Sequence, residues 1–170
     1  EPLLILIPYA AGTVLHDHAL AGWWLALTQA GELEPLFPVK DWALGPFLAR
    51  FRPPTRCYLA ADATGLWAAI WASPWVGGAI PGLWVRPDRR RTKAALRAVE
   101  DGVGALLAEW PVLVVVTRAP ARRDLYAHFG VAFSPAPIPA LFDGEAVWLG
   151  WLTADTFVRR CTPAVAGVAV

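Results

Sequence analysis

Hydrophobic residues along this chain recur with two periods, one typical of helices and one of strands. Leu20, Trp23 and Leu27 lie at spacings of three and four, the period of one helix face, and Gly31 follows as a stop signal. The same reasoning predicts helices over residues 15–30, 41–50, 92–110 and 121–129. Residues 32–38 are expected to form a loop.

Short apolar runs bounded by turn residues predict strands between and after these helices. They cover residues 3–7, 57–61, 66–71, 79–85, 112–116 and 146–153, with an irregular strand within 131–141. The run 79–85 is interrupted by Pro81 and Gly82, which predicts a β-bulge where ladder hydrogen bonds are absent and a ligand can approach. The sequence therefore predicts a domain that mixes helices with strands.

The composition narrows the class of protein. The 170 residues are enough for one domain, expected over residues 1–157, with residues 158–170 as a loosely attached tail. Hydrophobic residues make up 56% and charged ones 17%, against roughly 25% charged in ordinary soluble domains, so the surface is poor in charge. Together with ten tryptophans, this favours a surface partly covered by a protein partner or by self-association.

The net charge, the length of the apolar runs and the cysteine content argue against several other classes of protein. The net charge of +1 argues against nucleic acid as a partner of the whole molecule. No apolar run approaches the roughly 20 residues of a membrane-spanning helix. Cys57 and Cys161 are too few for a disulfide framework and lack metal-ligand spacing, so we expect a reducing, cytoplasmic location and no metal centre. His16 and His18 do not change this expectation, because residues two apart on a helix point in different directions.

A cluster of cations begins the predicted helix 92–110. Four of the five residues from 89 to 93 are Arg or Lys. A helix N-terminus already carries about half a positive charge, so basic residues there cost a few tenths to about 1 kcal/mol unless an anion lies nearby. Free N–H groups backed by arginines form a site for phosphate. A solvated basic turn without a ligand is the alternative, and the charge pattern alone does not decide between the two.

Residues 125–131 read Leu-Tyr-Ala-His-Phe-Gly-Val, and residues 85–95 contain Val85, Pro87, Arg90 and Ala95 at regular places. These two motifs and the order of the predicted elements over roughly residues 3–157 resemble the GNAT superfamily of acyl-CoA N-acyltransferases, whose last helix carries Leu-Tyr-x-x-x-Gly-Phe. Arg91 and Lys93 stand where a second family signature, Val-x-Pro-x-x-Arg-Gly-x-Gly-x-Gly/Ala, has glycine. The other defined positions of that signature match Val85, Pro87, Arg90 and Ala95.

The resemblance implies an α/β (α+β) fold, a single GNAT-like domain with a mixed, mostly antiparallel sheet of about six to seven strands flanked by about four helices. It implies acetyl-CoA or another acyl-CoA as cofactor, with the pantetheine arm along the strand 79–85. It makes Tyr126 the general acid that protonates the leaving thiolate. The cofactor pyrophosphate would lie at the helix start, and the implied cofactor-binding residues are Val85, Arg90, Arg91, Thr92, Lys93, Ala94 and Ala95.

The acceptor implied by the resemblance is an amine. Acylation of an ammonium nucleophile requires a group that takes up its proton. Glu32, Glu34 and Asp41 lie in the segment that lines the acceptor site in this family, so they are candidate substrate-binding residues. Solvated loop carboxylates without a ligand are the alternative for all three.

Two hypotheses for the function follow. The first is an N-acyltransferase in which an amine attacks the thioester directly. The second is a catalytically silent GNAT-fold structural or interaction subunit of a larger assembly such as a phage virion. The low surface charge, the many tryptophans and the altered glycine positions favour the second hypothesis.

Overall fold

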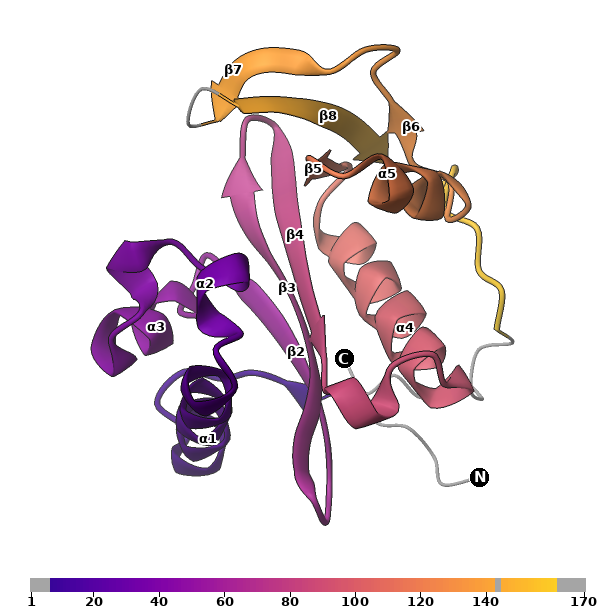
Figure 1. Ribbon diagram of the computed structural model, residues 1–170. Helices are drawn as coiled ribbons and strands as arrows, with labels where there is room; N and C mark the ends of the chain where they lie inside the picture. The colour runs from indigo at the N-terminus through magenta and orange to yellow at the C-terminus, as the bar shows by residue number, and fades with distance from the viewer. Residues whose placement is uncertain (1–6, 143–144, 162–170) are drawn as a thin grey trace.

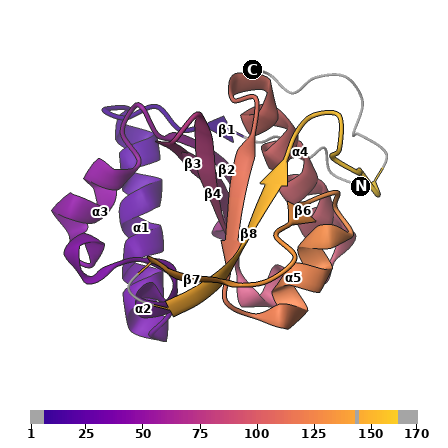
Figure 2. The same ribbon diagram turned by 90° about the horizontal axis from the view of Figure 1, so that it is seen from above.

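A mixed sheet separates two layers of helices in the computed structural model, which describes residues 7–142 and 145–161 (Figure 1). Figure 2 shows the helices of the N-terminal part on one face of the sheet and the later helices on the other. The first layer holds α1 (Val14–Ala30), α2 (Leu33–Leu36) and α3 (Leu44–Arg50), and the second holds α4 (Lys93–Glu109) and α5 (Pro120–Ala127). Two short 3-10 helices, η1 (Val39–Asp41) and η2 (Pro87–Arg89), lie in connections.

The sheet of the described residues has the order β1-β2-β3-β4-β5-β8-β6, with β7 paired to β8. Among the strand pairs that the described residues form, only β4–β5 is parallel. The predicted α/β fold with a mixed, mostly antiparallel sheet is therefore confirmed, and two of its eight strands are only two residues long. The strands are β1 (Ile7–Pro8), β2 (Arg56–Asp62), β3 (Gly65–Trp75), β4 (Gly78–Val85), β5 (Leu113–Thr117), β6 (Ala132–Phe133), β7 (Ile138–Phe142) and β8 (Glu145–Leu152).

Most differences from the predicted elements are local. The loop expected over 32–38 contains α2, a single helical turn that is too short to show a periodic pattern. The helix expected over 41–50 is divided, because η1 ends at Asp41 and α3 begins at Leu44. The strand expected over 3–7 lies largely outside the described residues. None of the described helices is long and apolar enough to cross a membrane.

The β-bulge predicted at Pro81 and Gly82 is wrong. The register of β3 and β4 is unbroken from Ala68↔Val85 to Trp75↔Gly78. Pro81 fits because alternate residues of a strand turn their N–H toward opposite neighbours, and its nitrogen faces away from β3. Gly82 fits because the indole of Trp71 lies over it, so that an added Cβ would be 2.3 Å from the ring.

The face under α1–α3 is packed with aromatic rings. Trp23 is at the centre of this aromatic cluster and is 2% exposed. Its ring centroid lies 5.3–5.9 Å from those of its aromatic neighbours, which is the range of favourable ring pairs. The neighbours are Phe37, Phe47, Phe51, Trp71 and Trp84.

The face under α4 is packed differently. Alanines of the helix, including Ala95 and Ala98, lie against the sheet and let α4 approach closely. The same helix buries Glu100, which is 1% exposed and accepts the backbone N–H groups of Arg160 and Cys161 at 2.6 and 3.0 Å. Residues 160 and 161 are therefore bound to α4, while residues 162–170 of the expected tail lie outside the described residues.

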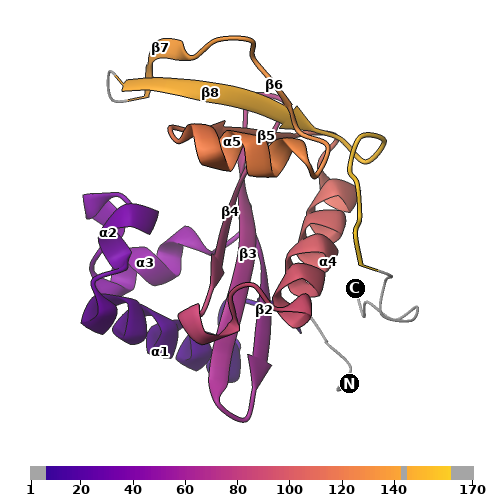
Figure 3. The same cartoon turned by 45° about the vertical axis from the view of Figure 1, so that its right-hand side comes forward.

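The two parts of the sheet meet at one residue pair. β3 and β4 are paired along eight residue pairs, but β4 and β5 only at Ala79↔Leu113. Figure 3 shows β5 and β8 running across the end of the β2–β4 layer. Gly78 lies at this join, where an added Cβ would be 2.5 Å from the carbonyl oxygen of Val112. Beyond Ala79, β4 and β5 separate.

Candidate functional site

The edge of β4 that faces β5 is open beyond the join. The N–H of Ala79 donates to Val112 at 3.1 Å, toward β5, whereas the N–H of Arg86 donates to Trp67 at 2.8 Å, toward β3. Strand alternation therefore turns the backbone groups of residues 81, 83 and 85 toward the opening. Pro81 offers only a carbonyl there, and Leu83 offers both an N–H and a carbonyl.

The N-terminus of α4 follows directly after this edge. The hydroxyl of Thr92 caps the helix by accepting the N–H of Ala95 at 3.1 Å. The N–H groups of Lys93 and Ala94 belong to the first turn, whose donors have no partner within a helix. They can therefore bind an anion, and the side chains of Arg91 and Lys93 form no ion pair or hydrogen bond with any described residue.

The backbone at Arg91 has a φ of 65°, in the left-handed region. This conformation suits glycine and costs other residues roughly 1–2 kcal/mol. The signature resembled here has glycine at this position, and the chain keeps the glycine-like turn while it carries an arginine.

Two of the cations in the predicted cluster are paired. Arg89 forms an ion pair with Asp62 and lies over the ring of Trp67, with 5.3 Å between guanidinium carbon and ring centroid. Hydrogen bonds from the side chain and backbone of Thr64, together with Arg89, lower the pKa of Asp62 to about 2. Arg90 donates through Nε to the carbonyl of Val85 at 2.8 Å. The free positive charge of the turn is thus that of Arg91 and Lys93.

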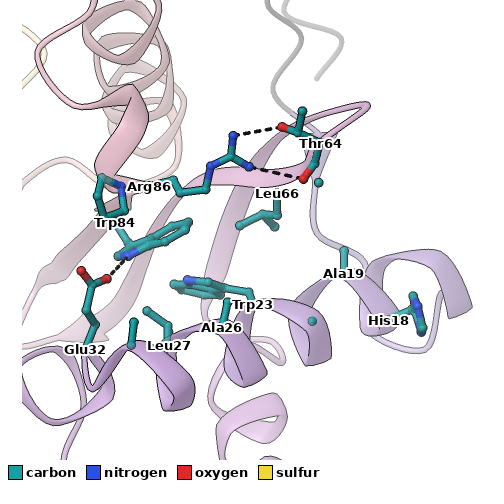
Figure 4. A pocket seen from close by; sticks show the side chains of 14 residues that line it. His18, Ala19, Trp23, Ala26, Leu27, Glu32, Thr64, Leu66, Trp84 and Arg86 are labelled. Carbon is teal, nitrogen blue, oxygen red and sulfur yellow. Dashed lines mark hydrogen bonds between the residues drawn. The ribbon is translucent and has the colours of Figure 1, made fainter.

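A pocket of about 480 Å³ lies on the other face of the sheet, between α1 and the end of β4 (Figure 4). Its walls are mostly apolar, and Glu32 is the carboxylate among them. One oxygen of Glu32 accepts the indole N–H of Trp84 at 3.1 Å, and the other lies 3.5 Å from Nη2 of Arg90. Arg90 therefore connects the cationic turn with the pocket.

The structure separates the three carboxylates predicted to bind substrate. Glu32 is half-buried and lines the pocket. Glu34 is exposed on α2 and is not part of the lining. Asp41 is buried in an ion pair with Arg50 at 2.6 Å, outside the lining, where it joins η1 to α3.

Tyr126 lies on α5, on the opposite face of the sheet from the pocket. It is half-buried and packs against the cluster that contains Val85, Ala95 and Leu113. Its hydroxyl forms no hydrogen bond with any described residue, so the group is available to a ligand. The structure thus brings Tyr126, the end of β4 and the start of α4 to one hydrophobic cluster.

No family model matches the sequence, and the search of curated proteins gives no match. Solved structures do match. A point mutant of the spermidine N-acetyltransferase from Vibrio cholerae superposes with a TM-score of 0.65 at 10% identity, over 88% of this chain and 95% of that one. A dodecameric structure of spermidine N-acetyltransferase from the same organism gives a TM-score of 0.66 at 10% identity, over 95% and 100%.

This chain has the GNAT fold. Another match, a mutant form of the spermidine/spermine N-acetyltransferase of Vibrio cholerae, has a TM-score of 0.65 at 10% identity and covers 89% of this chain and 94% of that one. At such identity the likeness concerns the fold alone. The signature matched by residues 85–95 spans the last residue of β4 and the start of α4.

Other candidate residues have structural roles. Asp17 accepts hydrogen bonds from Tyr9 and from the N–H of Gly12, and His16 accepts the N–H of Ala10, so both hold the start of α1. Among the described residues no group of three or more His, Cys, Asp or Glu could hold a metal ion. Burial raises the pKa of the Cys57 thiol far above its ordinary value, which leaves it unreactive.

Trp84 is both a core residue and a wall of the pocket. Its side chain is only 5% exposed and lines the pocket beside Glu32. Its place beside Val85 contained a signal, because neighbouring strand residues point to opposite faces. Val85 packs toward α4, so Trp84 points toward α1 and the pocket.

Proposed function

We propose that this chain is an acyl-CoA-dependent N-acyltransferase that transfers an acyl group, such as acetyl, to a primary amine. The observation that carries the proposal is the opening between β4 and β5 beyond Ala79↔Leu113, beside the start of α4. An extended chain of amide groups can pair with an open strand edge, and an anion can bind at a helix start. The residues present therefore fit the two chemical parts of coenzyme A.

Each group of residues has a role in this proposal. Lys93 and Ala94 bind the pyrophosphate through backbone N–H groups, with added charge from Arg91. The backbone of Pro81 and Leu83 pairs with the pantetheine amides. Bound acyl-CoA supplies an activated thioester. Glu32, on the other side of β4, orients the amine and takes up the proton that its nitrogen loses. The amine nitrogen forms the new bond to the acyl carbon as the C–S bond breaks, and Tyr126 donates a proton to the leaving sulfur.

Binding of acetyl-CoA tests the proposal directly. At about 100 times its dissociation constant, acetyl-CoA should stabilise the fold by about 2.7 kcal/mol and raise the Tm by several degrees. The double variant Arg91→Ala/Lys93→Ala should bind more weakly in isothermal titration calorimetry. Lys40→Ala/Arg52→Ala, which removes two exposed cations elsewhere, is the matched control. Absence of binding at millimolar acetyl-CoA would contradict the proposal.

Turnover is tested separately from binding. Release of free thiol from acetyl-CoA should require a primary amine. Tyr126→Phe should lower kcat by about 10²-fold or more while the affinity for acetyl-CoA stays the same. Equal kcat in Tyr126→Phe and the unmodified protein would remove Tyr126 from the proposed chemistry.

A second candidate is an interaction subunit without turnover, in which an apolar surface mediates assembly. Val14, Leu15 and Val76 are 80%, 78% and 82% exposed, and exposed apolar side chains favour association when they form a patch. Self-association is also known for a structure with the same fold, since one matching structure is dodecameric. Light scattering during size exclusion tests this candidate, and a monomer at all concentrations would contradict it.

A further inference from the structure

The pocket beside Glu32 is a trough along α1. Ala19, Gly22 and Ala26 lie on the same side of α1 at spacings of three and four, so this part of the helix surface is smooth. Leu66 and Trp84 of the sheet form the facing wall, and Trp23 and Leu27 of α1 also line the pocket (Figure 4). A space between a flat row of small residues and an indole ring fits a flat apolar body better than a branched or strongly polar one.

The two ends of the trough differ in polarity. Figure 4 shows Glu32 at one end and His18 at the other, with Thr64 and Arg86 above the trough. The Glu32 end is the one joined to Arg90, which binds the last carbonyl of β4. The carboxylate end is thus next to the open part of the sheet. A ligand with a cation at one end would place that cation close to β4.

Glu32 keeps capacity for a further donor. A carboxylate has about four acceptor sites. Trp84 uses one of them at 3.1 Å, and Arg90 approaches another at the long distance of 3.5 Å. An ammonium group can therefore bind Glu32 without displacing Trp84.

The charges that line the trough disfavour a polycation. Glu32 is its carboxylate, whereas Arg86 adds a positive charge and is held by Asp88 and Thr64. A polyamine would place its additional ammonium groups against apolar walls or beside Arg86, where they have no partner, and burial of an unpaired charge is costly.

We infer that the trough binds a monoamine with a flat apolar body, an arylalkylamine, with its ammonium on Glu32 and its ring between α1 and Trp84. This inference rests on the proposed function, because the transferase makes this amine the acceptor. It names a substrate class different from the spermidine in the names of the matching structures.

Titration calorimetry of three compounds without acyl-CoA tests the inference. The compounds are tryptamine, its uncharged analogue tryptophol, and spermidine. Tryptamine should bind at least tenfold more tightly than spermidine at equal ionic strength. Tryptophol should bind more weakly than tryptamine, since it has the ring but no cation.

Variants identify the contacts. Glu32→Gln should weaken tryptamine binding at least tenfold and change tryptophol binding less than threefold. Ala26→Phe should fill the trough and weaken both compounds at least tenfold; residue 26 is exposed on α1, so the fold should persist. Glu34→Gln, an exposed carboxylate of the same segment, is the matched control and should change neither affinity. Unchanged Tm values would verify that the variants are folded.

The amine inference and the transferase proposal would be overturned by different results. Spermidine binding as tightly as tryptamine, or tryptamine affinity unaffected by Glu32→Gln or Ala26→Phe, would overturn the inference even if acetyl-CoA binds. Failure of acetyl-CoA to bind, with tryptamine binding as expected, would overturn the transferase proposal and leave the trough as an amine-binding site.

Discussion

The two faces of the sheet both bury apolar side chains, but they are packed differently. Under α1–α3, the aromatic cluster of Trp23, Phe37, Phe47, Phe51, Trp71 and Trp84 fills the space with large rings. Under α4, small side chains allow close approach, and a buried carboxylate, Glu100, holds residues 160 and 161. Apolar packing dominates the first face, and polar contacts complete the second.

This difference explains where the two parts of the candidate site lie. Large rings pack around Trp23 and leave a trough beside it, lined by Trp84, that a small apolar molecule can enter. On the other face, the short side chains of α4 bring its N-terminus close to the end of β4, where backbone groups are open. In the function that we propose, the first face holds the amine acceptor and the second holds the acyl-CoA.

The largest expected loss of stability comes from removing one ring of the aromatic cluster. Phe47 is 0% exposed, and its ring contacts those of Trp23, Phe37 and Phe51. Phe47→Ala should lower the free energy of unfolding by about 3–5 kcal/mol, through lost burial and a new cavity. Urea denaturation measures the change. Leu25→Ala, at a half-exposed position of α1, is the control and should lower the free energy of unfolding by no more than about 0.5 kcal/mol. Equal losses in the two variants would show that a ring of the aromatic cluster stabilises the fold no more than a half-exposed leucine does.

The next effect comes from breaking the polar contacts of the second face. Glu100→Gln replaces the charged acceptor of two backbone N–H groups and should destabilise the fold by about 1–3 kcal/mol. Hydrogen exchange at residues 160 and 161 should accelerate more than exchange within α1. Unchanged exchange at these two amides would mean that Glu100 does not hold the segment.

A smaller effect is expected at the start of α4. Arg91→Gly should relieve the left-handed backbone, whereas Arg91→Ala keeps the cost of that conformation. The greater chain entropy of unfolded glycine offsets part of the gain. The glycine variant should therefore be about 0.5–1 kcal/mol more stable than the alanine variant in thermal unfolding. A more stable alanine variant would contradict the assigned backbone conformation.

The smallest expected effect on stability is that of Asp62 in the β2–β3 hairpin, which lies outside both packed faces. The pKa of Asp62 falls from 3.8 to about 2, mainly through Thr64, so its ionised form favours the folded state. That contribution is present above about pH 4 and is lost as the pH falls through 2. The stability difference between the unmodified protein and Asp62→Asn should therefore shrink between pH 4 and 2. A difference independent of pH would show that the interaction is not ionic.

Periodicity was sufficient to predict most of the fold. The spacing of Leu20, Trp23 and Leu27 located α1 and its buried side, and Gly31 ends the helix in the left-handed conformation. The bulge at Pro81 was wrong because the sequence does not reveal which strand neighbour a proline nitrogen faces. The burial of Glu100 was missed because a charged helix residue is normally solvated, and its partners lie 60 residues later in the sequence.

The candidate site was only partly predictable. The signature located the start of α4. The segment after α1 was expected to line an acceptor site, and Glu32 of that segment lies at the pocket, whereas the acceptor role stays a prediction. The sequence could not distinguish Glu32 from Asp41, because the ion pair of Asp41 with Arg50 depends on how η1 packs on α3. The connection from Arg90 to Glu32 joins residues 58 positions apart and had no local signal.

Gly78 determines how widely the sheet can open. The two parts of the sheet touch at one place, the contact of residues 78 and 79 with Val112 and Leu113. Any side chain at residue 78 would press on Val112 there and push the two parts of the sheet apart. The width of the opening at the far end of β4, and with it the size of the molecule that can lie there, is therefore set by a residue that need not touch that molecule.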